Sequence, residues 1–171
     1  HWARTVREVK RALPQARVEV LTPDFCGDLE AVARVLEAAP DVFNHNVETV
    51  PRLYRRVRPQ ADYRQSLGVL EFARRCAPAV LTKSGFMVGL GERVEEVQEL
   101  LRDLRAAGVE VVTIGQYLQP TRRQLPVAEY MEPEVFERYR RFGLELGFRA
   151  VFSGPLVRSS YMADLVAEEA R

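Results

Sequence analysis

Polar side chains able to bind a ligand are concentrated in residues 44–48, directly after a short apolar run. Asn44, His45, Asn46 and Glu48 all lie within these five positions. Amides and a carboxylate in such a cluster can hydrogen-bond the hydroxyls and amines of a sugar or an amino-acid moiety. A structural alternative is that the asparagines cap a turn while Glu48 caps the next helix. His45 alone decides nothing, because a single histidine is commonly a hydrogen-bonded structural residue.

A second candidate site lies in residues 82–92, where an apolar stretch ends in Gly89, Gly91 and Glu92 before a helical pattern. The run lacks both the complete dinucleotide fingerprint and the Gly-Lys-Ser/Thr phosphate clamp. It therefore predicts either a ligand loop, with glycines and the helix N–H groups facing a bound molecule, or a tight strand-to-helix turn without a ligand. Lys83 falls inside the apolar stretch, where a charge needs a partner or a ligand carboxylate.

Two serines near the C-terminus, Ser159 and Ser160, follow Arg158 and precede Tyr161. Serine is an ordinary first residue of a helix, and the pattern predicts a closing helix over residues 159–170. There is no general base near in sequence and no Gly-x-Ser-x-Gly elbow, so hydrolase chemistry is not supported.

The elements that must position these residues alternate between helical and strand periodicity, which predicts an α/β fold with a parallel sheet. Asp28 is an expected N-cap, and Gly108 is an expected helix C-cap. In parallel sheets, ligands bind beyond the carboxyl ends of the strands, where the polar segments above are found. The expected strands cover residues 17–21, 41–44, 80–88, 109–114 and 149–152, and the expected helices lie near 2–13, 28–36, 50–57, 62–76, 94–106, 133–146 and 159–170.

Composition narrows the function classes. With 171 residues, 47% of them hydrophobic, the chain can form one domain over residues 1–171. A net charge of +1 from 25 basic and 24 acidic residues gives no field for nucleic acid or an anionic membrane. No apolar run approaches the ~20 residues that span a bilayer. Cys26 and Cys76 fit no metal-ligand spacing, and a cytoplasmic setting with unpaired thiols is the simplest interpretation, although a disulfide stays open.

Six segments taken together resemble the lipoyl synthase family, in the same order and over essentially the whole chain. They are residues 22–25, 42–49, 83–85, 88–92, 115–120 and 158–161. The resemblance implies a radical S-adenosylmethionine (SAM) enzyme on a partial (β/α) barrel, with its first strands missing from this chain. It also implies insertion of two sulfur atoms, at carbons 6 and 8, into a protein-bound octanoyl group. The chain starts at His1 without a methionine, in what looks like a helix, which suggests that the beginning of a longer protein is missing.

One departure concerns the cofactors that this family carries. The resemblance implies SAM and two [4Fe–4S] clusters, each held by a group of three cysteines upstream of the matched region. Neither group is present in this chain, so the fragment alone is expected to be inactive. The implied partners are octanoylated lipoyl domains of 2-oxoacid dehydrogenases, the glycine-cleavage H protein, and an electron donor such as ferredoxin or flavodoxin.

The resemblance also implies roles for individual residues. One of Ser159 and Ser160 is the fourth ligand of the auxiliary cluster, and Arg158 either pairs with a carboxylate or fixes the C-terminal segment. The residues implied to face SAM are Asn44, Asn46, Glu48, Lys83, Gly89, Gly91, Gln116 and Leu118. Two alternatives stay open: another radical SAM enzyme on the same barrel, and a non-catalytic β/α domain that binds a nucleoside-like ligand.

Overall fold

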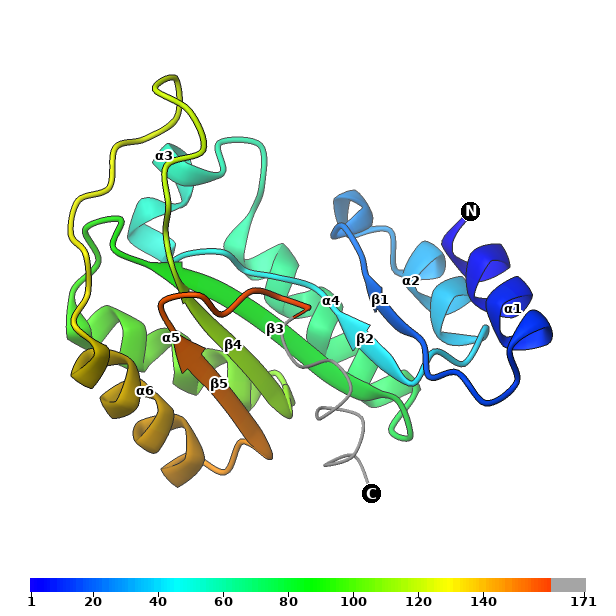
Figure 1. Cartoon of the computed structure of the whole chain (residues 1–171). Helices are drawn as coiled ribbons and strands as arrows, with labels where there is room; N and C mark the ends of the chain where they lie inside the picture. Colours follow the sequence, from blue (N-terminus) through cyan, green and yellow to red (C-terminus); the bar gives the residue numbers. More distant parts are fainter. Residues whose placement is uncertain (161–171) are drawn as a thin grey trace.

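The computed structural model describes residues 1–160 and contains a single five-stranded sheet (Figure 1). All strands are parallel, and their order across the sheet is their order in the sequence. This sequential order is that of a (β/α) barrel that stays open, and it confirms the predicted parallel α/β class. The strands are β1 (Glu19–Leu21), β2 (Val42–Asn44), β3 (Leu81–Val88), β4 (Val111–Gln116) and β5 (Ala150–Gly154).

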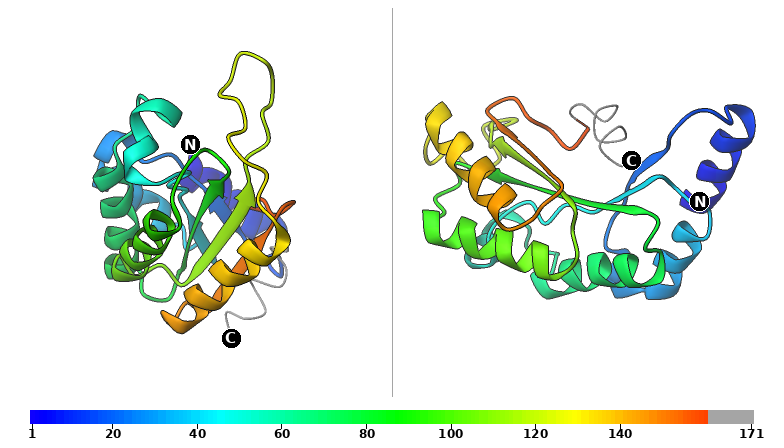
Figure 2. Two further views of the ribbon diagram at one scale, coloured as in Figure 1. Left: turned by 90° about the vertical axis from the view of Figure 1, so that its left-hand side faces the viewer. Right: turned by 90° about the horizontal axis from the view of Figure 1, so that it is seen from below.

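The helices connect successive strands and lie against one face of the sheet, as the view from below shows for α4 and α5 (Figure 2). The longer helices are α1 (Trp2–Ala12), α2 (Leu29–Leu36), α4 (Tyr63–Cys76), α5 (Val94–Ala106) and α6 (Pro133–Glu145). Short turns of helix form η1 (Phe25–Gly27), η2 (Pro51–Leu53) and α3 (Tyr54–Val57). Of the predicted closing helix, residues 161–170 lie outside the described residues. No helix within residues 1–160 is both long and apolar enough to cross a membrane.

Local capping explains where several helices begin and end. The Asp28 carboxylate accepts the Ala31 N–H and starts α2, as predicted, and Asp62 starts α4 in the same way through Gln65. These side chains satisfy backbone donors that have no partner inside the helix. Gly108 follows α5 with φ +84°, a left-handed conformation that glycine adopts without strain.

Side chains of each strand alternate between the two faces of the sheet. On the helix-covered face, Phe86 and Ile114 pack in the main core with leucines of α5. On the other face, Val42, Leu81 and Val111 belong to a smaller apolar cluster. The parallel register places Lys83 beside Val111, and Gly85 beside Thr113, on this second face. The candidate residues on odd positions of β3 therefore point away from the helices.

Candidate functional site

An ion pair and a hydrogen bond join three adjacent strands on the helix-free face. Lys83 Nζ on β3 lies 3.0 Å from both carboxylate oxygens of Glu19 on β1. Between them on β2, the Asn44 amide donates to the same carboxylate at 2.8 Å. Lys83 is fully buried, so the partner that its position demands is a carboxylate of this chain. Sequence reasoning missed Glu19, although its place between two valines is the same signal that singled out Lys83.

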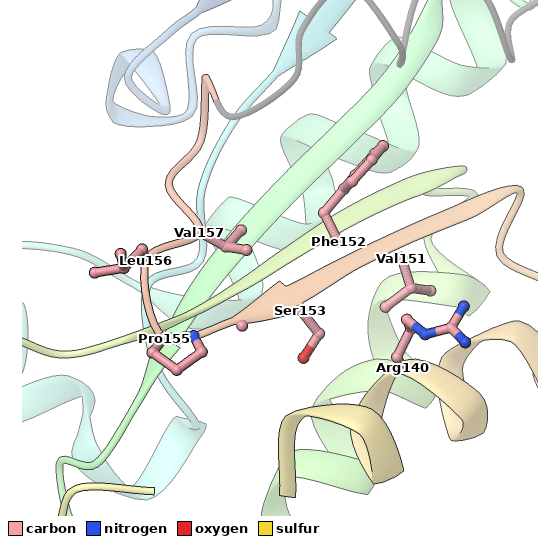
Figure 3. A pocket seen from close by; sticks show the side chains of 8 residues that line it. Arg140, Val151, Phe152, Ser153, Pro155, Leu156 and Val157 are labelled. Atoms are coloured by element: carbon pink, nitrogen blue, oxygen red, sulfur yellow. The ribbon is translucent and has the colours of Figure 1, made fainter. Parts of the chain in front are cut away.

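The chain after β5 folds back over the carboxyl ends of the neighbouring strands. Figure 3 shows Pro155, Leu156 and Val157 leaving the end of β5. A Cβ atom on Gly115 of β4 would collide with the Val157 carbonyl oxygen and would lie 3.0 Å from Arg158 Nη1. The missing side chain at position 115 therefore leaves the space that this segment occupies.

The returning segment brings two of the predicted site residues together. The Asn46 amide donates to Ser159 Oγ at 2.5 Å, across 113 positions of sequence. Ser159 is half-buried, whereas Ser160 is exposed. Arg158 donates to the carbonyl oxygens of Pro155 and Val157. Its guanidinium thus fixes the segment, which is the second of the two roles considered for it.

The loop after β2 presents polar atoms that the described residues leave unpaired. Asn44 Oδ1 and Asn46 Oδ1 are buried without a hydrogen-bond partner there. Glu48 extends the pairing beside β3, because its N–H donates to the Gly85 carbonyl and its carbonyl accepts from Met87. Burial raises the pKa of the Glu48 carboxyl above its ordinary value. These groups suit a ligand that offers amine or hydroxyl donors.

The capping interpretation of this loop is wrong. The side-chain amides of Asn44 and Asn46 bind Glu19 and Ser159, not the backbone of the turn. The next helical turn, η2, begins after Val50 without a side-chain cap, so Glu48 does not cap it. What holds the loop is its continuation of the sheet, which local sequence signals do not report.

The glycine run after β3 forms the tight turn that was one of its two interpretations. The Glu92 carboxylate accepts the N–H groups of Gly89 and Leu90 at 2.6 and 2.9 Å. These amides are therefore not free for an anionic ligand, as the other interpretation required. Gly89 and Gly91 have φ of +94° and +100°, and a Cβ on Gly89 would collide with the Gln116 amide and crowd the Glu129 carbonyl oxygen.

Gln116 and Leu118 lie apart from the polar cluster. Gln116 pairs with Val88 in register and faces the helix-covered side. Its amide donates to the carbonyls of Tyr117 and Glu129 and accepts from the Met131 N–H, so it anchors the long loop before α6. Leu118 is exposed at the start of that loop. A role for either residue toward SAM stays a prediction.

His45, at the carboxyl end of β2, is buried with Nδ1 2.9 Å from the Thr22 carbonyl oxygen. A carbonyl only accepts, so this contact needs the proton on Nδ1. Burial lowers the pKa of the imidazole below its ordinary value, which keeps the ring neutral. The histidine thus has the hydrogen-bonded structural place that the sequence suggested.

The lowered pKa of His45 predicts a pH dependence of stability. Below about pH 6.5 the unfolded chain takes up a proton on this imidazole that the folded chain excludes, so stability falls as the pH drops. His45→Asn keeps a side-chain donor for Thr22 but does not titrate. We expect the free energy of unfolding to fall less for this variant than for the wild type between about pH 7 and pH 5. Chemical denaturation at the two pH values measures this, and equal losses would contradict the assignment.

The described residues contain no evident metal site. Within residues 1–160 no group of three or more His, Cys, Asp or Glu side chains is placed to hold a metal ion. Cys26 and Cys76 are both exposed and unpaired, so the disulfide left open by the sequence is absent here.

Comparison with known families identifies the fold. The radical SAM superfamily matches residues 2–104, which is more than half of the chain. The protein therefore belongs to the radical SAM superfamily. Membership in the radical SAM superfamily implies SAM and an iron–sulfur cluster as cofactors of the complete enzyme.

Curated relatives within the radical SAM superfamily are lipoyl synthases. That of Rubrobacter xylanophilus is 58% identical over 170 residues, covering 99% of this chain and 53% of that protein. The enzyme of Caldanaerobacter subterraneus is 57% identical over all of this chain and 60% of its own length. That of Thermus thermophilus is 57% identical over 99% of this chain and 53% of its own. The predicted resemblance is confirmed, and the chain spans about half the length of these relatives.

Solved structures agree on the fold alone. Methylornithine synthase (PylB) superimposes with a TM-score of 0.67 at 19% identity, covering 86% of this chain and 42% of that chain. The radical SAM methyltransferase TsrM from Kitasatospora setae gives a TM-score of 0.52 at 18% identity, covering 80% of this chain and 27% of its own. At these identities the likeness supports an open barrel of the radical SAM type.

Proposed function

We propose that this chain is part of a lipoyl synthase, which inserts two sulfur atoms at carbons 6 and 8 of an octanoyl group carried on a protein lysine. The observation that carries the proposal is the identity of 57–58% to curated lipoyl synthases over nearly all of the chain. Because the chain spans about half of each of these proteins, the reaction is proposed for the complete gene product. On this proposal, residues 1–160 alone do not catalyse it.

The polar cluster after β2 fits SAM as a ligand. The buried oxygens Asn44 Oδ1 and Asn46 Oδ1 lack donors in the described residues, and the amine and hydroxyl groups of SAM would supply them. Glu48 would accept from the same ligand. Gly85 contributes space, because a Cβ there would collide with Thr113 and crowd Asn46. Lys83, paired with Glu19, holds the floor of this region and does not itself reach a ligand in the proposal.

Two [4Fe–4S] clusters and SAM, when bound, would supply the radical chemistry and the sulfur. The cysteine ligands would come from parts of the protein other than this chain. This chain would contribute Ser159 or Ser160 as an oxygen ligand to the auxiliary cluster. An oxygen is a weaker partner for iron than a thiolate, which suits a ligand that must leave. Asn46, through its bond to Ser159, would hold the serine segment over the strand ends.

The partners of the reaction follow from the same proposal. They are octanoylated lipoyl domains of 2-oxoacid dehydrogenases, the glycine-cleavage H protein, and a ferredoxin or flavodoxin as electron donor, in the cytoplasm. We propose no nucleic acid and no membrane as partner, because the charges of the chain as a whole are balanced.

The test is assay of the complete gene product after anaerobic reconstitution, with an octanoylated carrier peptide, SAM and reductant. Roughly eight irons per chain, equal to two four-iron clusters, together with dithiolated product would support lipoyl synthase. About four irons, with SAM cleavage but no sulfur transfer, would instead favour another radical SAM enzyme. A protein without iron that still binds SAM would favour a non-catalytic domain.

A further inference from the structure

A cavity of about 490 Å³ lies between α3 and the loop that follows β4. Much of its lining is apolar and includes Val57, Met87, Leu90 and Leu125. The two walls are the segments that rise above the sheet around α3 and after β4 (Figures 1 and 2). The cavity thus opens near the carboxyl ends of the strands, on the same edge of the sheet as the polar cluster.

The two segments that form its walls are depleted of acidic residues. Residues 49–61 contain four arginines and no Asp or Glu, and residues 111–128 contain two arginines and no Asp or Glu. The chain as a whole carries 25 basic and 24 acidic residues. The balance is therefore broken locally, at the walls of one cavity.

Four of these arginines have no partner among residues 1–160. Arg52 pairs with Glu96, and Arg58 donates to the Asn46 carbonyl and lies over the Tyr54 ring. The other four are exposed, and none of their side chains forms an ion pair or hydrogen bond with another described residue. We call them the basic rim: Arg55, Arg56, Arg122 and Arg123, of which Arg56 and Arg123 line the cavity.

The only carboxylate in the cavity lining does not offset the rim. Glu48 is largely buried beside β3, where burial raises the pKa of its carboxyl. Exposed arginines without partners favour a negatively charged surface, and they are enriched at protein interfaces because the guanidinium is weakly hydrated. An apolar cavity between them suits an aliphatic chain more than a compact free anion.

We propose that the basic rim is the docking surface for an acidic protein domain that presents an acyl group on a lysine arm, with the arm directed into the cavity. The identity of the arm rests on the proposed function, whereas the acidic character of the partner follows from the rim itself. Docking by the rim would orient the domain before the acyl chain reaches the strand ends. Charged rims of this kind act mainly on the rate of association and on its salt dependence.

The test is a double charge reversal, Arg56→Glu with Arg123→Glu, in the complete gene product. The matched control reverses Arg4 and Arg7 of α1, which are exposed, have no ion-pair partner within residues 1–160, and lie on the far side of the molecule (Figure 1). The probe is a net-acidic octanoylated lipoyl domain, and its Kd is measured by titration calorimetry at low and high salt. We expect the rim variant to bind roughly tenfold more weakly at low salt, with a smaller difference at high salt. The control should stay within about twofold of the wild type.

A second readout separates this inference from the proposed function. Turnover is compared between the octanoylated domain and a short uncharged octanoyl-lysine peptide, and the domain-to-peptide ratio should fall about tenfold in the rim variant. Equal domain affinity of the rim variant and the wild type would overturn the inference, as would displacement of the domain by RNA and not by excess unmodified lipoyl domain. Rim-dependent binding in a protein that forms no lipoyl product would support the docking surface and refute the proposed function.

Discussion

Replacing both serines of the returning segment, Ser159→Ala with Ser160→Ala, is expected to lower lipoyl product roughly 100-fold while SAM cleavage continues. In the proposed function, one of these oxygens is a ligand of the sulfur-donating cluster. Its loss removes sulfur transfer without touching the groups that would hold SAM. Asn46 already contacts Ser159 at 2.5 Å, so the serine segment and the polar cluster form one site in the folded chain.

Product and cleaved cofactor are quantified in the same anaerobic reaction by mass spectrometry. The single variants then assign the ligand, since only the replacement of the ligating serine should reproduce the double variant. Ser153→Ala is a matched control, because Ser153 donates to the Phe136 carbonyl on α6 and has no place in the site. Normal product from the double variant would refute the role of this motif.

Lys83→Met is expected to destabilise the fold by about 3 kcal/mol, the second large effect. Lys83 is fully buried, and its ammonium lies 3.0 Å from both oxygens of Glu19. Methionine fills a similar volume but leaves the Glu19 carboxylate without its cation, on a largely buried face. Removing one partner of a buried pair costs more than the pair contributes, because the remaining charge stays desolvated.

Two variants control for the Lys83 prediction. Lys10→Met breaks the partly exposed pair of Lys10 with Asp41 at 3.1 Å and should cost less than about 1 kcal/mol. Glu19→Gln with Lys83→Met removes both charges and keeps an oxygen for the Asn44 amide, so it should recover part of the loss. The free energy of unfolding comes from urea titration. A Lys83→Met protein as stable as the Lys10→Met protein would show that the buried pair does not stabilise the fold.

The helices and strands were predictable because their signals are local. Asp28 caps α2, Pro133 opens α6 and the apolar stripe of α5 enters the core, as the spacing of these residues indicates. Each of these effects acts within one or two turns of chain. The polar segments after the strands could also be located, because in a parallel sheet all carboxyl ends lie on one edge.

The chemistry of each polar residue was less predictable, because it depends on contacts between distant segments. Lys83 finds Glu19 across 64 positions and Asn46 finds Ser159 across 113. The register of the sheet and the return of the chain after β5 create these pairs. In the glycine run, the signal left two interpretations open, and only the position of the Glu92 carboxylate decides between them.

The sequence by itself determined the class of fold, the order of its elements and the family, because periodicity, caps and motif order are properties of the chain alone. The tertiary structure decided which face each polar side chain shares and with what partner. Alternation along a strand sends Gln116 toward the helices and Lys83 away from them. Whether a buried polar group is satisfied within the protein or left for a ligand depends on neighbours that only folding brings within hydrogen-bond distance.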